Sequence, residues 1–328
     1  MKKAVVTGGG GFIGSYLVRR LVECGWNVVV VDNLARGRVE RLQSVMDQLD
    51  WQQGDVRDPA LMKTASMDAD VIFHLAAVNG TENFYKQPEL VLDVGLRGAL
   101  AAMEGGRDAG VPDIVIASSA EVYQTPDKVP TDETVALTLP DSLNPRYSYG
   151  GSKIVSELIA FNYAREHYRK VQVFRPHNVY GPDMGWKHVL PQFIVRAKEL
   201  IAQHPVGTVP FPIQGDGRET RAFCYVDDVV DGILTMYQHG SHREVYHIGN
   251  QEMVSIADLV HLVADYFERD FELVTGELAI GGTRVRCPDI SKMAALGYQP
   301  SVALAEGVRR TADWYVRNSR PPRDNALL

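Results

Sequence analysis

A tyrosine and a lysine four positions apart are the residues of this sequence best suited to acid–base chemistry. Tyr149 and Lys153 stand at the start of a segment with helical periodicity, Lys153–His167. Positions i and i+4 lie about 40° apart around an α-helix, so a phenol and an ammonium group there can face one site. The ammonium favours the phenolate, and we expect the pKa of Tyr149 to lie below its usual value near 10. Tyr149 is therefore a candidate general base, although such a pair also arises by chance on exposed helices.

Two serines and a glutamate follow one of the apolar segments that we expect to form strands. Ser118 and Ser119 come directly after Ile114–Ala117, and Glu121 lies two positions further on. The strands of a parallel sheet end at one edge, where ligands of α/β proteins bind. Ser119 can therefore donate a hydrogen bond to the oxygen that Tyr149 deprotonates. Glu121 is either a second base or a structural carboxylate behind the site.

A glycine-rich segment near the start of the chain is suited to bind a dinucleotide. The segment Thr7–Gly14 contains the spacings G-x-G-x-x-G and G-x-x-G-x-x-G, carried by Gly8, Gly9, Gly11 and Gly14. An apolar segment, Ala4–Val6, precedes it, and a helical segment, Phe12–Glu23, overlaps its end. In that context, glycines let the backbone approach a pyrophosphate, and the helix N-terminus offers free N–H groups to the anion.

An aspartate after the second predicted strand indicates which dinucleotide binds. Asp32 follows Asn27–Val31 and lies eighteen positions after the last glycine of this segment. A spacing of about 20 is expected for a carboxylate that accepts hydrogen bonds from an adenosine ribose. Because this carboxylate would repel a 2′-phosphate, the sequence favours NAD, while Arg36 and Arg38 keep NADP as an alternative. Asp55, after a third predicted strand, either accepts from the adenine amino group or caps a turn.

The apolar segments alternate with longer helical segments over the first half of the chain. Short β-branched runs recur at Ala4–Val6, Val28–Val31, Val71–Phe73, Ile114–Ile116 and Val171–Phe174. Such strands between helices are typical of a parallel sheet covered on both faces. We therefore expect an α/β fold with a doubly wound parallel (Rossmann) NAD-binding domain over residues 1–180. Residues 181–328 should form mainly a smaller α/β lobe for the substrate, some segments of which can return to the first domain, with the ligands in the cleft between.

The composition is that of an ordinary globular protein. Of 328 residues, 45% are hydrophobic and 23% charged, and 34 basic against 41 acidic residues give a net charge of −7. Without a basic block, nucleic acid is not an expected partner. No apolar run approaches the roughly 20 residues that span a bilayer, and Met1-Lys2-Lys3 lead into only a short apolar run. We therefore expect no membrane segment, no signal peptide and a cytoplasmic location. The three separated cysteines indicate neither a disulfide framework nor a metal site.

Taken together, these motifs resemble those of the extended short-chain dehydrogenase/reductases, and more narrowly the NAD-dependent sugar-nucleotide epimerase/dehydratase family. The matching segments are Thr7–Gly14, Asp32–Leu34, His74–Ala77, Ser118–Tyr123, Tyr149–Lys153, Arg175–Pro182, Asp216–Asp228 and Arg286–Lys292. The resemblance extends over nearly the whole chain.

The resemblance implies a role for individual residues. Ser119, Tyr149 and Lys153 match the catalytic serine or threonine, tyrosine and lysine, with Glu121 beside them. The positions that match NAD contacts are Gly8, Gly11, Phe12, Ile13, Gly14, Asp32, Asn33, Asp55, Val56, Leu75, Ala76 and Ala77, together with Tyr149 and Lys153. The positions that match contacts to a nucleotide-diphosphate sugar are Asn178, Val189, Arg221 and Arg286. Guanidinium groups suit phosphate oxygens, so the two arginines fit this role chemically.

Three positions depart from the family pattern. Gly95 stands where many relatives have asparagine, so one polar contact of the family is absent or replaced. Gln124 stands where glycine is usual. Ala120 replaces the acid with which 4,6-dehydratases protonate a leaving hydroxyl, whereas Glu121 keeps the candidate base.

The resemblance implies that the enzyme first oxidises a sugar carbon, most simply C4, with NAD as the hydride acceptor. Tyr149 would remove the hydroxyl proton, and the positive nicotinamide ring would add to the effect of Lys153. Because of Ala120, we expect C4 epimerisation through a 4-keto intermediate. The alternatives are a dehydratase or a decarboxylase with Glu121 as base, and a non-catalytic NAD-binding sensor.

The resemblance also implies a homodimer. Many relatives pair the helix that begins at the catalytic tyrosine with the preceding long helix in a four-helix interface. Apolar side chains suited to this use are Ile154, Leu158, Ile159 and Phe161. Part of the same surface must also cover the sheet.

Overall fold

The central sheet of the structure is wholly parallel. The computed structural model describes residues 1–277 and 284–318, and within them a seven-stranded sheet has the order β11-β6-β5-β4-β1-β2-β3. Its strands are β1 (Lys3–Thr7), β2 (Asn27–Asp32), β3 (Leu49–Gln53), β4 (Val71–His74), β5 (Asp113–Ala117), β6 (Lys170–Pro176) and β11 (Glu244–Ile248). Every neighbouring pair runs parallel, which confirms the predicted doubly wound (Rossmann) fold.

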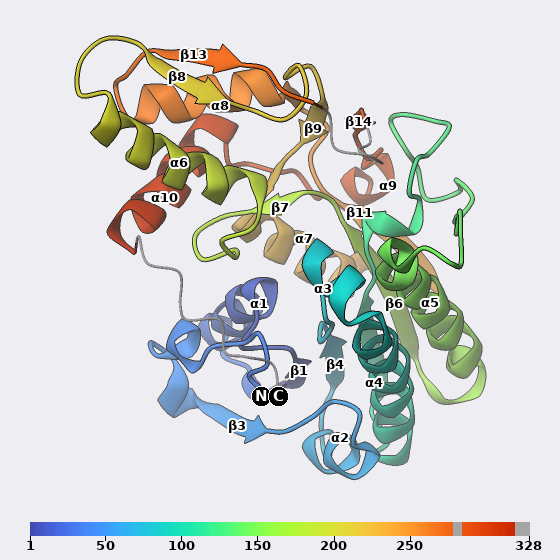
Figure 1. The fold of residues 1–328 in the computed structure, drawn as a ribbon. Helices are drawn as coiled ribbons and strands as arrows, with labels where there is room; N and C mark the ends of the chain where they lie inside the picture. The colour runs from blue at the N-terminus through green and yellow to red at the C-terminus, as the bar shows by residue number, and fades with distance from the viewer. Residues whose placement is uncertain (278–283, 319–328) are drawn as a thin grey trace.

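Helices cover both faces of this sheet because its strands are apolar on both. In β2, for example, Val28–Val31 are all buried. The helices on one face are α1 (Phe12–Glu23) and α7 (Val226–His239). Those on the other face are α2 (Pro59–Ala65), α4 (Pro88–Asp108) and α5 (Ser148–His167). Figure 1 shows the sheet between these two layers.

The order of the strands reverses beside β1. After β3, the chain returns to place β4 on the other side of β1. Ligands of doubly wound sheets bind at such a switch point, beyond the carboxyl ends of the strands. The glycine-rich turn follows β1 and the segment Leu75–Ala77 follows β4. The fold therefore brings these two predicted cofactor-binding segments to the same place.

A second group of elements packs around a core of its own. Its larger elements are α6 (Val189–Gln203), α8 (Ile256–Tyr266), α10 (Leu304–Arg317) and the parallel pair β8 (Val209–Pro212) and β13 (Phe271–Val274). Its smaller strands are β7 (Val179–Tyr180) paired with β10 (Cys224–Tyr225), and β9 (Thr220–Ala222) between β12 (Met253–Ser255) and β14 (Val285–Arg286). Two short helices, α3 (Thr81–Lys86) and α9 (Ser291–Ala294), instead pack on the cores of the central sheet, through Phe84 and Met293. Figure 1 shows α6, α8 and α10 gathered apart from the central sheet, whereas α7 and β11, from the same half of the chain, belong to it.

A glycine in α4 allows α5 to approach closely. A Cβ atom on Gly95 would lie 2.8 Å from the side chain of Ser152. The Ser156 hydroxyl donates to the Gly95 carbonyl oxygen over 3.2 Å. Glycine at position 95, where many relatives have asparagine, therefore lets α5 lie against α4 at the turn that carries Lys153.

Gly95→Ala should destabilise the protein, although alanine is the better helix former. The added methyl group would lie within 2.8 Å of Ser152, so α5 must shift. We expect the free energy of unfolding to fall by about 1–3 kcal/mol, as at other overpacked sites. The control is Gly151→Ala, where the nearest atom is 3.5 Å away, and it should gain up to about 1 kcal/mol. Urea titrations measure both values, and equal stability of the two variants would contradict the close approach.

Candidate active site

The glycine-rich turn forms a cradle that suits a dinucleotide pyrophosphate. Gly8 has a φ of +71°, and a Cβ atom there would lie 2.9 Å from the Ala76 backbone nitrogen. A Cβ atom on Gly14 would overlap the Gly8 carbonyl oxygen. Gly11 precedes α1, and no side chain caps the first N–H groups of that helix. These groups therefore remain available to an anion, and the residues present fit the phosphates of NAD.

A buried threonine–histidine pair joins the end of β1 to the segment that follows β4. The Thr7 hydroxyl and His74 Nδ1 form a hydrogen bond of 2.9 Å. The backbone N–H groups of Leu75 and Ala76 donate to the same hydroxyl over 3.2 and 3.3 Å. Burial lowers the pKa of His74 to about 3, so its ring is neutral. Sequence reasoning missed this pair, whose only signal was a polar residue at the end of each of two strands.

The Asp32 carboxylate lies beside the glycine-rich turn. It accepts hydrogen bonds from the backbone N–H groups of Gly10, over 2.9 Å, and Leu34, over 2.8 Å. Burial raises its pKa, although these two hydrogen bonds oppose the shift. Each carboxylate oxygen keeps a lone pair. The expected contact of Asp32 with the adenosine ribose stays a prediction.

Asp55 is bound to a neighbouring arginine. The Arg57 side chain donates to both of its carboxylate oxygens over 2.9 and 2.6 Å, and the Arg57 backbone N–H donates over 2.9 Å. The hydrogen bonds from the Arg57 side chain lower the pKa of Asp55 to about 2. The Asn33 side chain donates to Asp55 over 3.2 Å, and Val56 is buried. Asp55 thus caps a turn, as one of the two sequence interpretations expected, and its role toward adenine stays a prediction.

The three predicted catalytic side chains come together between β5 and α5. Tyr149 lies in the first turn of α5, where the Ser119 side chain is close enough to lower its pKa. Its ring stacks on Phe84, with 5.2 Å between the ring centroids. The Lys153 Nζ lies 5.7 Å from the centroid of the Tyr149 ring and donates to the Ala117 carbonyl oxygen over 2.7 Å. Because Ala117 ends β5, this last bond joins the helix to the strand.

The pKa of Tyr149 differs from the sequence expectation. Burial raises it to about 12, and this outweighs the lowering by the hydrogen bond from Ser119 and by the charge of Arg36. Burial also lowers the pKa of Lys153 to about 8, and its ammonium points to Ala117. The expected lowering of the Tyr149 pKa by Lys153 is therefore wrong when only the protein groups act. Loss of hydration has the larger effect on these buried side chains.

Glu121 lies between two arginines from distant parts of the chain. It accepts from Arg146 over 2.9 Å and from Arg286 over 2.6 Å. Burial opposes its ionisation, but these two guanidinium groups hold its pKa below the usual value. The Arg146 Nη1 is buried and has no hydrogen-bond partner among the described residues. Sequence reasoning missed Arg146, which stands three positions before Tyr149.

The two predicted phosphate-binding arginines are neighbours in a small sheet. The register of β9 and β14 places Arg221 opposite Arg286. The Asn178 side chain donates to the Ala222 carbonyl oxygen over 3.1 Å and thus contacts the same strand, β9. Val189 begins a different element, α6. The tertiary structure therefore brings three of the four predicted substrate-binding residues to one small sheet.

The glutamine that replaces a family glycine adopts a backbone conformation that favours glycine. Gln124 has a φ of +53°, in the left-handed region that other residues rarely occupy. Its side chain donates to the Glu121 carbonyl oxygen over 2.5 Å. This hydrogen bond ties the strained residue to the turn that carries Glu121.

Within residues 1–277 and 284–318, no three side chains of the metal-binding types cluster. No helix in the same ranges is long and apolar enough to cross a membrane.

Comparison with known proteins places these features in context. Residues 4–249 match the model of the NAD-dependent epimerase/dehydratase family. The UDP-glucose 4-epimerase of Mycolicibacterium smegmatis is 30% identical, over 97% of this chain and 100% of the relative. UDP-glucuronic acid decarboxylase 3 of Arabidopsis thaliana is 32% identical, over 93% of this chain and 86% of the relative. A crystal structure of the UDP-glucose 4-epimerase of Thermotoga maritima with UDP-glucose gives a TM-score of 0.85 at 29% identity, over 97% of this chain and 100% of that chain.

Lys153→Met should remove a dependence of the stability on pH. The folded protein binds the Lys153 proton more weakly, with a pKa of about 8 against the usual 10.5. The buried ammonium therefore costs folding free energy below about pH 8, and the cost disappears as the pH rises toward 10.5. Because the variant also loses the hydrogen bond to Ala117, the pH dependence isolates this cost: between pH 7 and pH 10, the free energy of unfolding of the wild type should rise by about 1–3 kcal/mol relative to that of the variant.

Urea titrations at several pH values measure this change. The control is Lys63→Met on the exposed side of α2, which should change stability by less than about 0.5 kcal/mol at any pH. A difference between Lys153→Met and the wild type that stays constant from pH 7 to pH 10 would show that the ammonium carries no burial cost.

Proposed function

Since the chain belongs to the NAD-dependent epimerase/dehydratase family, we propose that this enzyme is a nucleotide-sugar 4-epimerase. The observation that supports this most is the position of the buried Lys153 ammonium, which lies 5.7 Å from the centroid of the Tyr149 ring and donates to the end of the strand that leads to Ser119. The UDP-glucose 4-epimerase of Mycolicibacterium smegmatis, a relative of this chain, supports the same reaction. Ala120 supports epimerisation over dehydration, because it cannot protonate a leaving hydroxyl.

The residues of this chain act on the C4 hydroxyl of the sugar. NAD, when bound, supplies a reversible hydride acceptor, so that oxidation and reduction of the same carbon consume no cofactor. Tyr149 accepts the hydroxyl proton and returns it after the sugar has turned its other face. Ser119 donates a hydrogen bond to the same oxygen. Lys153 holds the first turns of α5 against β5, and its charge together with that of the nicotinamide ring, when NAD is bound, would lower the pKa of Tyr149 and so supply the phenolate that accepts the proton.

The small sheet beside this site is suited to hold the nucleotide diphosphate. Arg221 and Arg286 face each other across β9 and β14, and planar guanidinium groups bind phosphate oxygens in pairs. Asn178 contacts the same sheet, and Val189, at the start of α6, covers the nucleotide. These four assignments are part of the proposal.

A second candidate function is decarboxylation of a nucleotide-linked uronic acid. It is favoured by the two guanidinium groups on Glu121 and by the unpaired Nη1 of Arg146. A sugar carboxylate could accept a hydrogen bond from this Nη1. A relative named UDP-glucuronic acid decarboxylase supports the same alternative. After oxidation at C4, loss of carbon dioxide from the neighbouring carbon would compete with epimerisation.

Incubation with a panel of nucleotide sugars tests the proposed function. With NAD and UDP-glucose, UDP-galactose or UDP-glucuronic acid, we expect the C4 epimer of at least one substrate, detected by NMR, without net reduction of NAD. Tyr149→Phe should lower the rate by about 10²-fold or more, because it removes the base. Tyr147→Phe, two residues away, is the matched control and should keep most of the activity.

Other products of the same assay identify the other reactions. Release of carbon dioxide from UDP-glucuronic acid would establish the second candidate, and a 4-keto-6-deoxy product would indicate a dehydratase. Unchanged turnover by Tyr149→Phe would refute the catalytic assignment. No turnover of any substrate, with NAD still bound, would favour the non-catalytic sensor.

We also propose that the enzyme is a homodimer that pairs α4 and α5 with their copies. Exposed apolar side chains on these helices support it: Leu158 is 57% exposed, Val155 40% and Leu92 39%. Ile159 and Phe161, in contrast, pack partly against the core, so they cover the sheet. The proposed interface therefore uses the side of α5 that carries Val155 and Leu158. It does not use Ile159 and Phe161, which the sequence suggested.

Leu158→Asp should convert this dimer to a monomer, because it puts a charge into the apolar contact. Light scattering at micromolar concentration measures the mass of each variant. The control is Val206→Asp, at a residue that is 83% exposed and outside both helices, which should leave the dimer intact. A wild-type protein that is already monomeric at this concentration would contradict the proposal.

A further inference from the structure

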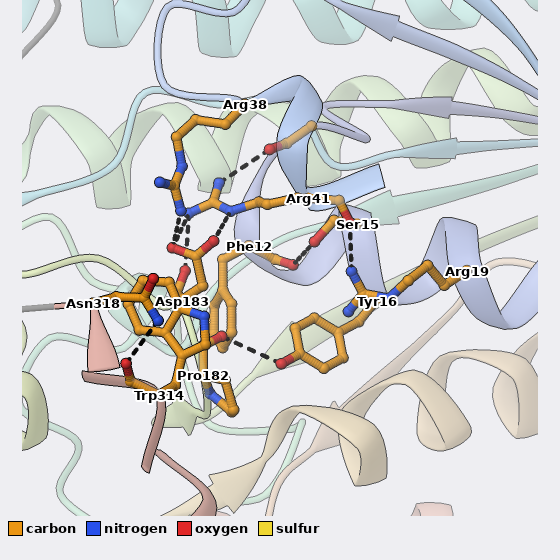
Figure 2. Close-up of polar contacts among 11 residues, drawn as sticks. Phe12, Ser15, Tyr16, Arg19, Arg38, Arg41, Pro182, Asp183, Trp314 and Asn318 are labelled. Atoms are coloured by element: carbon orange, nitrogen blue, oxygen red, sulfur yellow. Dashed lines mark hydrogen bonds and ion pairs between the residues drawn. The ribbon is translucent and has the colours of Figure 1, made fainter. Parts of the chain in front are cut away.

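An aspartate from the second half of the chain binds two arginines from the first. Asp183 lies between β7 and α6, and Figure 2 shows its carboxylate facing the guanidinium groups of Arg38 and Arg41. Arg41 donates to the two carboxylate oxygens over 2.9 and 3.2 Å and to the Asp183 carbonyl oxygen over 2.8 Å. Arg38 forms an ion pair with the same carboxylate. One carboxylate thus pairs with both guanidinium groups, and the three side chains together keep a net charge of +1.

The segment that carries Asp183 is held firmly in this position. Asp183 has a φ of +63°, a conformation that costs a non-glycine residue free energy and is kept only where the surroundings require it. Tyr16 on α1 donates to the Pro182 carbonyl oxygen over 3.3 Å, and Figure 2 shows this contact beside the arginines. The position of the carboxylate is therefore set by contacts with three residues of the first half of the chain.

The two arginines lie next to the residue that is expected to face the adenosine ribose. The Arg38 backbone N–H and the Arg41 side chain both donate to the Gly10 carbonyl oxygen, over 2.9 and 3.0 Å. The N–H of the same Gly10 donates to the Asp32 carboxylate over 2.9 Å. Gly37, which precedes Arg38, packs directly on that carboxylate. Asp32 and the arginine pair are therefore joined through one glycine of the cofactor cradle.

This arrangement bears on the choice between NAD and NADP. The two dinucleotides differ only by a 2′-phosphate on the adenosine ribose, and proteins that prefer NADP bind this group with a nearby arginine. Arg36 donates to the Asn79 carbonyl oxygen, and Arg38 is paired with Asp183. The arginines that kept NADP open as an alternative in the sequence thus have other partners in the structure.

We propose that Asp183 is a cofactor-specificity residue, which occupies Arg38 and Arg41 and so withholds them from the 2′-phosphate of NADP. Asp32 then selects NAD by accepting hydrogen bonds from the ribose and repelling the phosphate. The side chains of Arg41, Asp183 and Arg38 are only 11%, 16% and 29% exposed, so water and salt screen these charges weakly. Removing the aspartate charge leaves two guanidinium groups that a phosphate can bind.

Asp183→Asn tests this proposal through binding, independently of any sugar reaction. Calorimetric titration of the full-length protein with NAD and with NADP gives the ratio of the two Kd values. We expect the variant to lower the ratio Kd(NADP)/Kd(NAD) by about tenfold or more, the effect of one charge-assisted hydrogen bond. Adding Arg38→Ala to this variant should raise the ratio again by about threefold or more, while Arg41 accounts for the part that is not restored.

A matched control separates charge from loosening of the segment. Glu82→Gln weakens the ion pair between Glu82 and Lys187. Lys187 lies four residues after Asp183, whereas Glu82 belongs to a different helix, α3. We expect this variant to keep the wild-type ratio. An equal fall of the ratio in Glu82→Gln, or an unchanged ratio in an Asp183→Asn protein that binds NAD, would overturn the proposal.

Arg38→Ala by itself provides a second test, which also applies if Asp183→Asn does not fold. Because Asp183 already occupies Arg38, its removal should change the ratio by less than about threefold. A tenfold rise of the ratio would show that Arg38 serves NADP in the wild-type protein, and it would refute the proposed role of Asp183.

Discussion

The hydrogen bond from the buried Lys153 ammonium to the Ala117 carbonyl oxygen is the contact on which the proposed chemistry depends. It joins the first turns of α5 to the end of β5. Because Tyr149 begins that helix and Ser119 follows that strand, the bond determines how the two hydroxyl groups meet. It is maintained against the loss of hydration that lowers the pKa of Lys153 to about 8. Close packing makes it possible, since Gly95 of α4 leaves room for α5.

Two clusters of charged side chains in the structure have the same arrangement. In each, a single carboxylate is bound by two guanidinium groups from other parts of the chain: Glu121 by Arg146 and Arg286, and Asp183 by Arg38 and Arg41. Such partly buried ion pairs contribute little net stability, because desolvation offsets the attraction. In our proposals their effect is on recognition, because Glu121 and its arginines lie beside the residues assigned to the sugar, and Asp183 and its arginines lie beside the residue assigned to the adenosine ribose.

The tyrosine illustrates how far local patterns predict chemistry. The spacing of Tyr149 and Lys153 predicted that the two side chains face one site, and in the structure the Lys153 Nζ lies 5.7 Å from the centroid of the Tyr149 ring. It did not predict the direction in which the protein groups shift the pKa of Tyr149, because the spacing says nothing about burial or about the partner of the ammonium. In the structure, burial raises the pKa of Tyr149 to about 12, and the ammonium donates to a backbone carbonyl.

The sequence by itself determined the Rossmann fold, the glycine-rich cradle and the trio of Ser119, Tyr149 and Lys153. These depend on local signals, which are the apolar periodicity of strands and helices and the short spacings of glycine, tyrosine and lysine. Only the tertiary structure decided that Arg146 binds Glu121 and that Asp183 binds Arg38. The physical reason is that ion pairing and desolvation depend on distances between side chains far apart along the chain, which only packing of the whole molecule sets.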